Sequence, residues 1–197
     1  MSTPAAEAED QLWLVRHGET EWSLSGRHTS TTDLPLTEAG EAGARALEPV
    51  LADLDFAQVL TSPRRRARRT AELAGFAHAG VDDDLAEWSY GDYEGLTTPQ
   101  IRESDPGWTI WTHPSPGGET AADVASRLDR VVARARAAEG RTLVFAHGHS
   151  LRALAARWLG LDVAEGRHFA LDTSTISVLG VDRGTPVVRR WNVVPTG

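Results

Sequence analysis

The chain has 197 residues, a mass of 21.3 kDa and a formal net charge of −8 at pH 7, and this length suits one domain that buries its own core. It contains no cysteine, which excludes disulfides, thiolate metal sites and a cysteine nucleophile and fits a reducing compartment. The negative net charge disfavours nonspecific binding to nucleic acid. No apolar stretch approaches the length that spans a membrane.

Residues 1–10 are rich in alanine and glutamate. They have neither a basic start nor an apolar run, so we expect a disordered leader and not a signal peptide. We expect residues 11–197 to form one domain, because no repeat or low-complexity linker divides them. The prediction is a cytoplasmic protein, and the sequence does not fix its oligomeric state.

Strands and helices alternate along the chain, which favours a single α/β domain with a mostly parallel central sheet and helices on both faces. Thr37 is predicted to cap one helix, and Ser62 with Pro63 to open another. A polar loop is expected at 23–35, and a turn at 182–184 joins the last two strands. The expected strands are 11–16, 58–61, 141–146, 176–181 and 186–193, and the expected helices are 38–52, 63–74, 120–138 and 150–159.

Two of the expected strands end at histidine. Arg16-His17-Gly18 follows the first strand, and His147-Gly148-His149 follows the strand at 141–146. Ligands of open α/β sheets bind in the crevice outside the carboxyl ends of the strands, so these histidines can meet there although they are far apart in sequence. Two imidazoles at that position point to phosphate chemistry.

Basic residues concentrate at Arg64-Arg65-Arg66-Ala67-Arg68-Arg69. They lie at the start of a predicted helix, where the helix dipole also favours an anion. A positive pocket in an acidic protein indicates a small anionic substrate. Successive side chains of a helix point 100° apart, so we expect most of these arginines to be solvated and Arg64 to be the one that reaches a distal anion.

These motifs, together with Glu87 in the segment 85–95, occur in an order that resembles the histidine phosphatase superfamily, the phosphoglycerate-mutase-like proteins. The resemblance covers about residues 11–181. Within it, the segments 20–23, 32–37 and 82–85 are more similar to the acid-phosphatase and sedoheptulose-bisphosphatase branches than to the glycolytic mutases. The resemblance implies a cofactor-independent phosphomonoester hydrolase of the acid-phosphatase type that acts on small phosphorylated metabolites.

The resemblance also implies a role for each catalytic residue. His17 is the expected nucleophile and forms a phosphohistidine, while its other ring nitrogen donates to a backbone carbonyl. Arg16 and Arg66 neutralise the phosphoryl oxygens, and His147 donates to one of them. Glu87 is the expected general acid, which protonates the leaving oxygen and then activates water.

Other residues are assigned less directly. On composition alone, five nearby acids compete with Glu87, namely Asp82, Asp83, Asp84, Asp92 and Glu94. Continued strand alternation predicts that His149 points away from His147, and Trp108 and Trp111 are candidates for a pocket wall. The residues that resemblance predicts to bind substrate are Ser23, His28, Thr29, Tyr90, Gly148 and Arg152.

Two departures put the geometry of one loop in question. Ser23 and Ser30 stand where many members of the superfamily carry asparagine and glycine.

Three other functions compete with hydrolysis. A mutase shares the catalytic residues but needs a substrate-enclosing insertion, and only a short segment lies between Gly95 and Gly118. A metallohydrolase could use His17 with His147 and His149, but no acidic ligand stands at a suitable spacing, so we expect no metal. A binding module that kept only the fold is disfavoured by the intact set of predicted catalytic residues.

Overall fold

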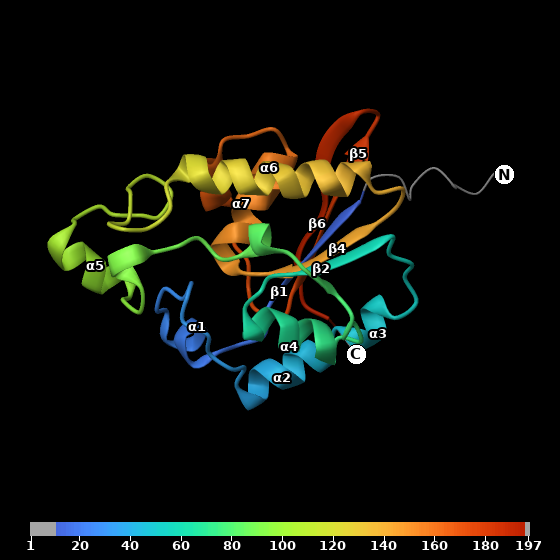
Figure 1. The fold of residues 1–197 in the computed structure, drawn as a ribbon, viewed down its shortest axis with the longest axis horizontal. Coiled ribbons are helices and arrows are strands. Elements are labelled where there is room, and N and C mark those ends of the chain that lie inside the picture. Colours follow the sequence, from blue (N-terminus) through green and yellow to red (C-terminus); the bar gives the residue numbers. More distant parts are fainter. Residues whose placement is uncertain (1–10, 196–197) are drawn as a thin grey trace.

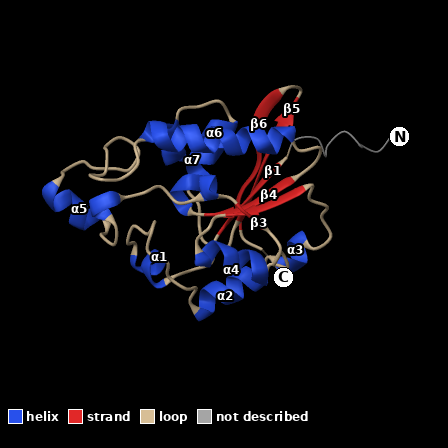
Figure 2. Ribbon diagram, viewed as in Figure 1, coloured by secondary structure: helices blue, strands red, loops and turns tan. Residues whose placement is uncertain are grey.

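The computed structural model describes residues 11–195, and the predicted leader at 1–10 lies outside the described residues. Its centre is a six-stranded sheet in the order β3-β2-β4-β1-β5-β6 (Figure 2). The four strands from β3 to β1 run parallel, and β5 runs antiparallel to both of its neighbours, β1 and β6, so the predicted mostly parallel sheet is confirmed. The strands are β1 Leu12–Arg16, β2 Gln58–Thr61, β3 Gly80–Val81, β4 Thr142–Ala146, β5 Ile176–Asp182 and β6 Thr185–Val193.

Helices cover both faces of this sheet, as predicted: α6 and α7 lie on one side and α2, α3 and α4 on the other (Figure 1). Among residues 11–195, no helix is both long and apolar enough to cross a membrane. The α-helices are α1 Glu21–Ser25, α2 Glu38–Arg45, α3 Glu48–Leu51, α4 Arg65–Leu73, α5 Thr98–Ser104, α6 Ala121–Ala137 and α7 Gly148–Trp158. The 3₁₀ turns are η2 Asp83–Leu85, η3 Gly91–Tyr93 and η4 Val163–His168.

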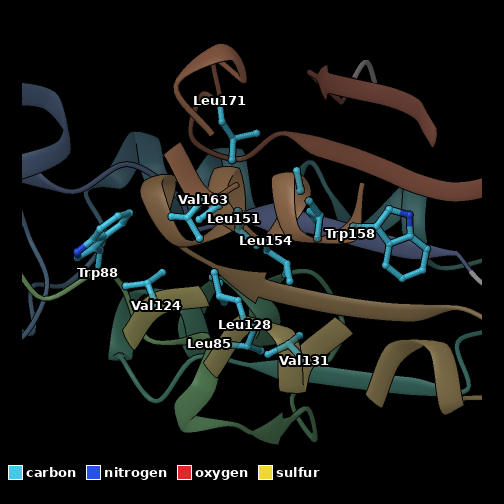
Figure 3. Packing of buried hydrophobic residues seen from close by; sticks show 14 of the residues in the cluster. Leu85, Trp88, Val124, Leu128, Val131, Leu151, Leu154, Trp158, Val163 and Leu171 are labelled. Atoms are coloured by element: carbon cyan, nitrogen blue, oxygen red, sulfur yellow. The ribbon is translucent and has the colours of Figure 1, made fainter. Parts of the chain in front are cut away.

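The two core clusters follow from the strand period of two. Leu14 and Val144 pack on one face with α6 and α7, and Val15 and Phe145 pack on the other. Figure 3 shows the first cluster, in which side chains of α7 and α6 come together. Because α6, η4 and β1 all pack against α7, most of the residues of this helix are buried. This packing fixes the start of α7 relative to the sheet.

The register of the central strands brings the two histidine motifs together. Arg16, the last residue of β1, pairs with Ala146, the last residue of β4. The backbone N–H of His17 then donates to the Ala146 carbonyl at 2.9 Å. Since both strands end at one level, the residues that follow them share one edge of the sheet.

Two predicted helix boundaries are wrong for local reasons. The helix expected at 38–52 divides into α2 and α3, because Pro49 has no N–H to donate to the Arg45 carbonyl. The helix expected from Pro63 begins at Arg65, and its N-cap residue, Arg64, is extended. The Ser62 hydroxyl contacts His147 at 2.7 Å, so it is drawn toward the sheet edge.

Several segments are helical where the prediction was not, among them α5 and the three 3₁₀ turns, and two of these differences concern residues near the histidine motifs. Within the expected loop at 23–35, α1 reaches Ser25, held by a capping box between Thr20 and Ser23 and ended by Gly26 at φ 72°. The last helix begins at Gly148 and not at residue 150, with His147 as its N-cap. His149 therefore lies in the first turn of a helix, and strand alternation does not apply to it.

Candidate active site

His17 lies just past the end of β1, with only 5% of its surface exposed. Its Nδ1 is 2.7 Å from the Gly18 carbonyl oxygen, so Nδ1 carries the proton and donates, as the sequence predicted. Burial lowers the pKa of His17 well below 6.5, and the charges of Arg66 and Arg16 lower it further. The ring is therefore neutral at pH 7, with a free electron pair on Nε2.

The loop that carries His17 is held by close backbone packing. The Gly18 N–H donates to the Thr70 hydroxyl of α4 at 2.9 Å. A Cβ atom on Gly18 would lie 2.4 Å from the Gly40 carbonyl oxygen, and one on Gly40 would lie 2.1 Å from the Glu19 carbonyl oxygen. Only glycine fits at either position, and this contact fixes His17 against α2.

Arg66 and His147 lie near His17, and both are fully buried. The His17 and His147 rings are 5.1 Å apart. His147 Nδ1 accepts from Arg66 Nε at 3.2 Å, and its Nε2 contacts the Ser62 hydroxyl at 2.7 Å. Burial lowers the pKa of His147 well below 6.5, helped by Arg66 and His17. Both His147 nitrogens are therefore occupied, and its contact with a phosphoryl oxygen stays a prediction.

The guanidinium of Arg66 is fixed by the loop at 29–32. It donates to the carbonyls of Thr29, Ser30 and Thr32 at 3.0–3.2 Å, which together with its bond to His147 leaves one of its five N–H groups free. Glu94 holds the same loop from the other side, because its carboxylate accepts from the N–H groups of Ser30 and Thr32 at 2.9–3.0 Å. Glu94 thus acts as a clamp on the loop.

Arg16 projects from the end of β1 beside the first residue of α7. Its Nη1 donates to the Leu171 carbonyl, and its guanidinium lies 3.4 Å from where a Cβ atom on Gly148 would stand. Its Nε is buried and makes no hydrogen bond to the described residues. Burial lowers the pKa of Arg16 below its usual value, but the residue remains a cation at pH 7.

Glu87 is buried and accepts three backbone hydrogen bonds. Its Oε1 accepts from the N–H of Trp88 at 2.9 Å and of Ser150 at 2.7 Å, and its Oε2 accepts from His149 at 3.0 Å. Two of these donors belong to the first turn of α7, where N–H groups lack partners within the helix. The start of α7 therefore positions Glu87.

The acids predicted to compete with Glu87 have other partners or lie outside the cavity. Asp82 and Asp84 form ion pairs with Arg130 and Arg134 of α6, and Glu94 clamps the loop. None of the five competitors lines the cavity that contains His17 and Glu87. The geometry leaves Glu87 as the carboxylate beside the nucleophile.

A cavity of about 240 Å³ opens beside His17 and Glu87, but the predicted catalytic residues Arg66 and His147 do not line it. Its lining includes Arg16, His17 and Glu87 and all six residues predicted to bind substrate, namely Ser23, His28, Thr29, Tyr90, Gly148 and Arg152. Binding by these six stays a prediction. A larger groove of about 720 Å³ lies along α4 and β3, but it contains none of the catalytic candidates and bears on no chemistry of the site.

Some lining residues were missed or misplaced from sequence. The lining also contains Thr20, Gly26, Arg27, His149 and Leu171. Of these five, only His149 could have been found from sequence, because it follows His147 by two residues and lies in the first turn of α7. Trp108 and Trp111 do not line the cavity and lie behind its wall: Trp108 packs on His28, and Trp111 lies under the Arg152 guanidinium at 4.7 Å. Arg64 does not reach the cavity either.

Metal ligation finds no support in the geometry. Within the part of the chain that is described, no group of three or more histidine, aspartate or glutamate side chains could hold a metal ion. His147 is bonded to Arg66 and Ser62, and a guanidinium donor on a ring nitrogen occupies the electron pair that a metal would need.

Comparison with known proteins gives one consistent family. The profile described as the histidine phosphatase superfamily (branch 1) matches residues 12–194. The chain is 47% identical over 178 residues to an acid phosphatase of Mycobacterium tuberculosis, with 88% of each chain covered. It is 42% identical over 183 residues to sedoheptulose 1,7-bisphosphatase of Saccharomyces cerevisiae, covering 76% of this chain and 68% of that one. A solved structure of an open reading frame from M. tuberculosis superposes with a TM-score of 0.91 at 44% identity, covering 94% and 98%.

Proposed function

The chain belongs to the histidine phosphatase superfamily, and from that premise we propose that it hydrolyses phosphomonoesters of small metabolites through a phosphohistidine at His17. It is a phosphatase whose cavity is lined by the histidine nucleophile, the Glu87 carboxyl group and Arg16, while Arg66 is fully buried and does not line it. The observation that carries the proposal is the His17–Gly18 hydrogen bond, since it fixes the tautomer and leaves Nε2 as the attacking atom.

In the first step, Nε2 of His17 attacks phosphorus in line with the ester oxygen. The N–P bond forms as the P–O bond breaks, and Glu87 gives its proton to the leaving oxygen. Oε2 of Glu87 accepts one backbone hydrogen bond where Oε1 accepts two. Because each carboxylate oxygen has two electron pairs, Oε2 is the atom that can carry the proton.

In the second step, water attacks the phosphorus of the phosphohistidine. The Glu87 carboxylate takes a proton from that water, the P–N bond breaks, and inorganic phosphate leaves with His17 neutral again. Charge on the phosphoryl oxygens is met by Arg16, whose buried Nε has no hydrogen-bond partner among the described residues, and by the free N–H of Arg66. No metal ion or cofactor is needed for either step.

We assign the activity to the acid-phosphatase type. Burial and two neighbouring arginines lower the pKa of His17 well below 6.5, so the nucleophile stays unprotonated in mild acid. The similarity of the chain to an acid phosphatase of M. tuberculosis supports this assignment. We further propose a cytoplasmic location and no nucleic-acid partner, which cell fractionation and a DNA-binding assay test.

The deciding experiment is a screen of the chelator-treated protein against phosphorylated metabolites, with release of inorganic phosphate as the readout and substrates ranked by kcat/KM. We expect phosphate release from several small monoesters. Transfer of the phosphoryl group to a second position or a second molecule, with little free phosphate, would favour the mutase instead. No turnover of any phosphomonoester would favour the binding module.

A further inference from the structure

A hydrogen-bonded pair of side chains, Tyr90 and His149, lines the cavity and takes no part in the two steps above. The Tyr90 hydroxyl oxygen is 2.6 Å from Nδ1 of His149. Tyr90 precedes η3, whereas His149 lies in the first turn of α7. The pair therefore connects two separate elements at the cavity wall.

The direction of this hydrogen bond follows from the protonation states. Burial raises the pKa of Tyr90 well above 10, so its hydroxyl keeps the hydrogen. Burial, with the nearby charge of Arg152, lowers the pKa of His149 well below 6.5, so its ring is neutral. The Tyr90 hydroxyl then donates to Nδ1, and the single ring proton of His149 is on Nε2. Among the described residues, no acceptor bonds this Nε2–H.

The backbone of the same residue contacts the general acid. The N–H of His149 donates to Oε2 of Glu87 at 3.0 Å, and Oε2 is the atom proposed to protonate the leaving oxygen. His149 thus contacts the general acid through its backbone and also lines the cavity that contains His17 and Glu87.

Aromatic rings surround this donor, and the Arg152 guanidinium lies over one of them, Trp111. The His149 ring lies 5.8 Å from that of His28 and 5.3 Å from that of Trp111. Burial lowers the pKa of His28 to about 4, so that ring is neutral as well. A neutral imidazole N–H carries no charge to attract an anion, but it can donate a hydrogen bond to an uncharged acceptor. The oxygen of a hydroxyl group is such an acceptor.

We propose that His149 is a specificity residue whose Nε2–H binds a hydroxyl oxygen of the leaving group, so that phosphate esters of sugars and polyols are preferred over alkyl phosphates. This inference rests on the phosphatase function proposed above. A leaving group without that hydroxyl lacks the hydrogen bond to Nε2–H, which is the basis of the discrimination.

The test compares two substrates of equal carbon number, glycerol 1-phosphate and propyl phosphate, by their ratio of kcat/KM. The wild type is expected to prefer the glycerol ester. His149→Phe keeps a planar ring without the N–H and should lower the ratio by roughly 3- to 10-fold, the value of one net hydrogen bond. His149→Gln retains an N–H donor and should keep part of the preference. His78→Phe, an exposed histidine outside the cavity, is the matched control and should leave the ratio unchanged.

Tyr90→Phe gives a second measurement that leaves His149 in place. Without the hydroxyl, the ring proton is free to occupy either nitrogen, so the ratio should again fall. Near-ultraviolet circular dichroism shows whether each variant is folded. A wild type without preference, or equal losses for both substrates in folded His149→Phe, overturns the proposal. A wild type that hydrolyses neither ester contradicts the phosphatase function itself, which is a separate result.

Discussion

Replacing Glu87 with glutamine tests the proposed proton transfer. The hydrogen bonds of Glu87 show how much stability the substitution is expected to remove. The amide oxygen can keep the two hydrogen bonds that Oε1 accepts from Trp88 and Ser150. The amide nitrogen then stands where Oε2 was and faces the N–H of His149, so two donors oppose each other. One buried hydrogen bond is lost, and a buried donor is left unpaired.

We therefore expect Glu87→Gln to fold with an unfolding free energy lower by about 1–3 kcal/mol. Because the amide has no proton to give, single-turnover phosphorylation by an alkyl phosphate should slow by roughly 10²- to 10⁴-fold. A nitrophenyl phosphate has a good leaving group that needs little protonation. Its phosphorylation step should slow much less.

The assay is rapid-quench single turnover with both substrates, together with chemical denaturation. Glu103→Gln, at an exposed position of α5, serves as the control and should change neither rate. If dephosphorylation of His17 becomes limiting, a burst of nitrophenol will show it. Equal losses of phosphorylation rate for both substrates would remove Glu87 from the acid role and redirect the search to Asp84, Asp92 or Glu94.

Three further predictions concern packing, pH and metal. Gly40→Ala should lower the unfolding free energy by about 1–3 kcal/mol although alanine favours helices, because its Cβ would lie 2.1 Å from the Glu19 carbonyl oxygen; a stabilised variant would refute this contact. His28 has a pKa of about 4 when folded and about 6.5 when unfolded, so the unfolded chain binds more protons between these values. Unfolding free energy should therefore fall as the pH drops from 6.5 toward 4, and His28→Gln should show a shallower fall, by about 1.4 kcal/mol per pH unit. Chelator treatment should leave phosphatase activity intact, and activity restored only by a divalent ion would revive the metallohydrolase.

Much of the fold was predictable because its signals are local. The apolar runs at β1 and β4 stop at histidine, and the Thr120 cap fixes the start of α6. The turn between β5 and β6 places Arg183 and Gly184 at positive φ, as a tight hairpin requires. Where a side chain takes a tertiary partner instead, prediction fails: the Ser62 hydroxyl contacts His147, so α4 begins two residues later than expected.

In the site, too, features with a local sequence signal were predictable, and features that depend on tertiary contacts were not. The predicted catalytic residues meet because the register of β1 against β4 is dictated by their buried faces. The predicted direction of His149 is wrong because it assumes that the strand continues past His147, whereas α7 begins at Gly148. The clamp by Glu94 was not predictable, since it joins two loops that are distant in sequence and carry no pattern.

The central claim is that the phosphoryl group is transferred to His17. Brief reaction with ³²P-labelled substrate, followed by rapid quenching in alkali and peptide mapping, tests it most directly. We expect an acid-labile, alkali-stable label on the peptide that contains His17, and we expect folded His17→Ala to lose both the label and at least about 10³-fold of kcat. A folded His17→Ala variant that keeps near-normal turnover, or a label on another residue, would contradict the account.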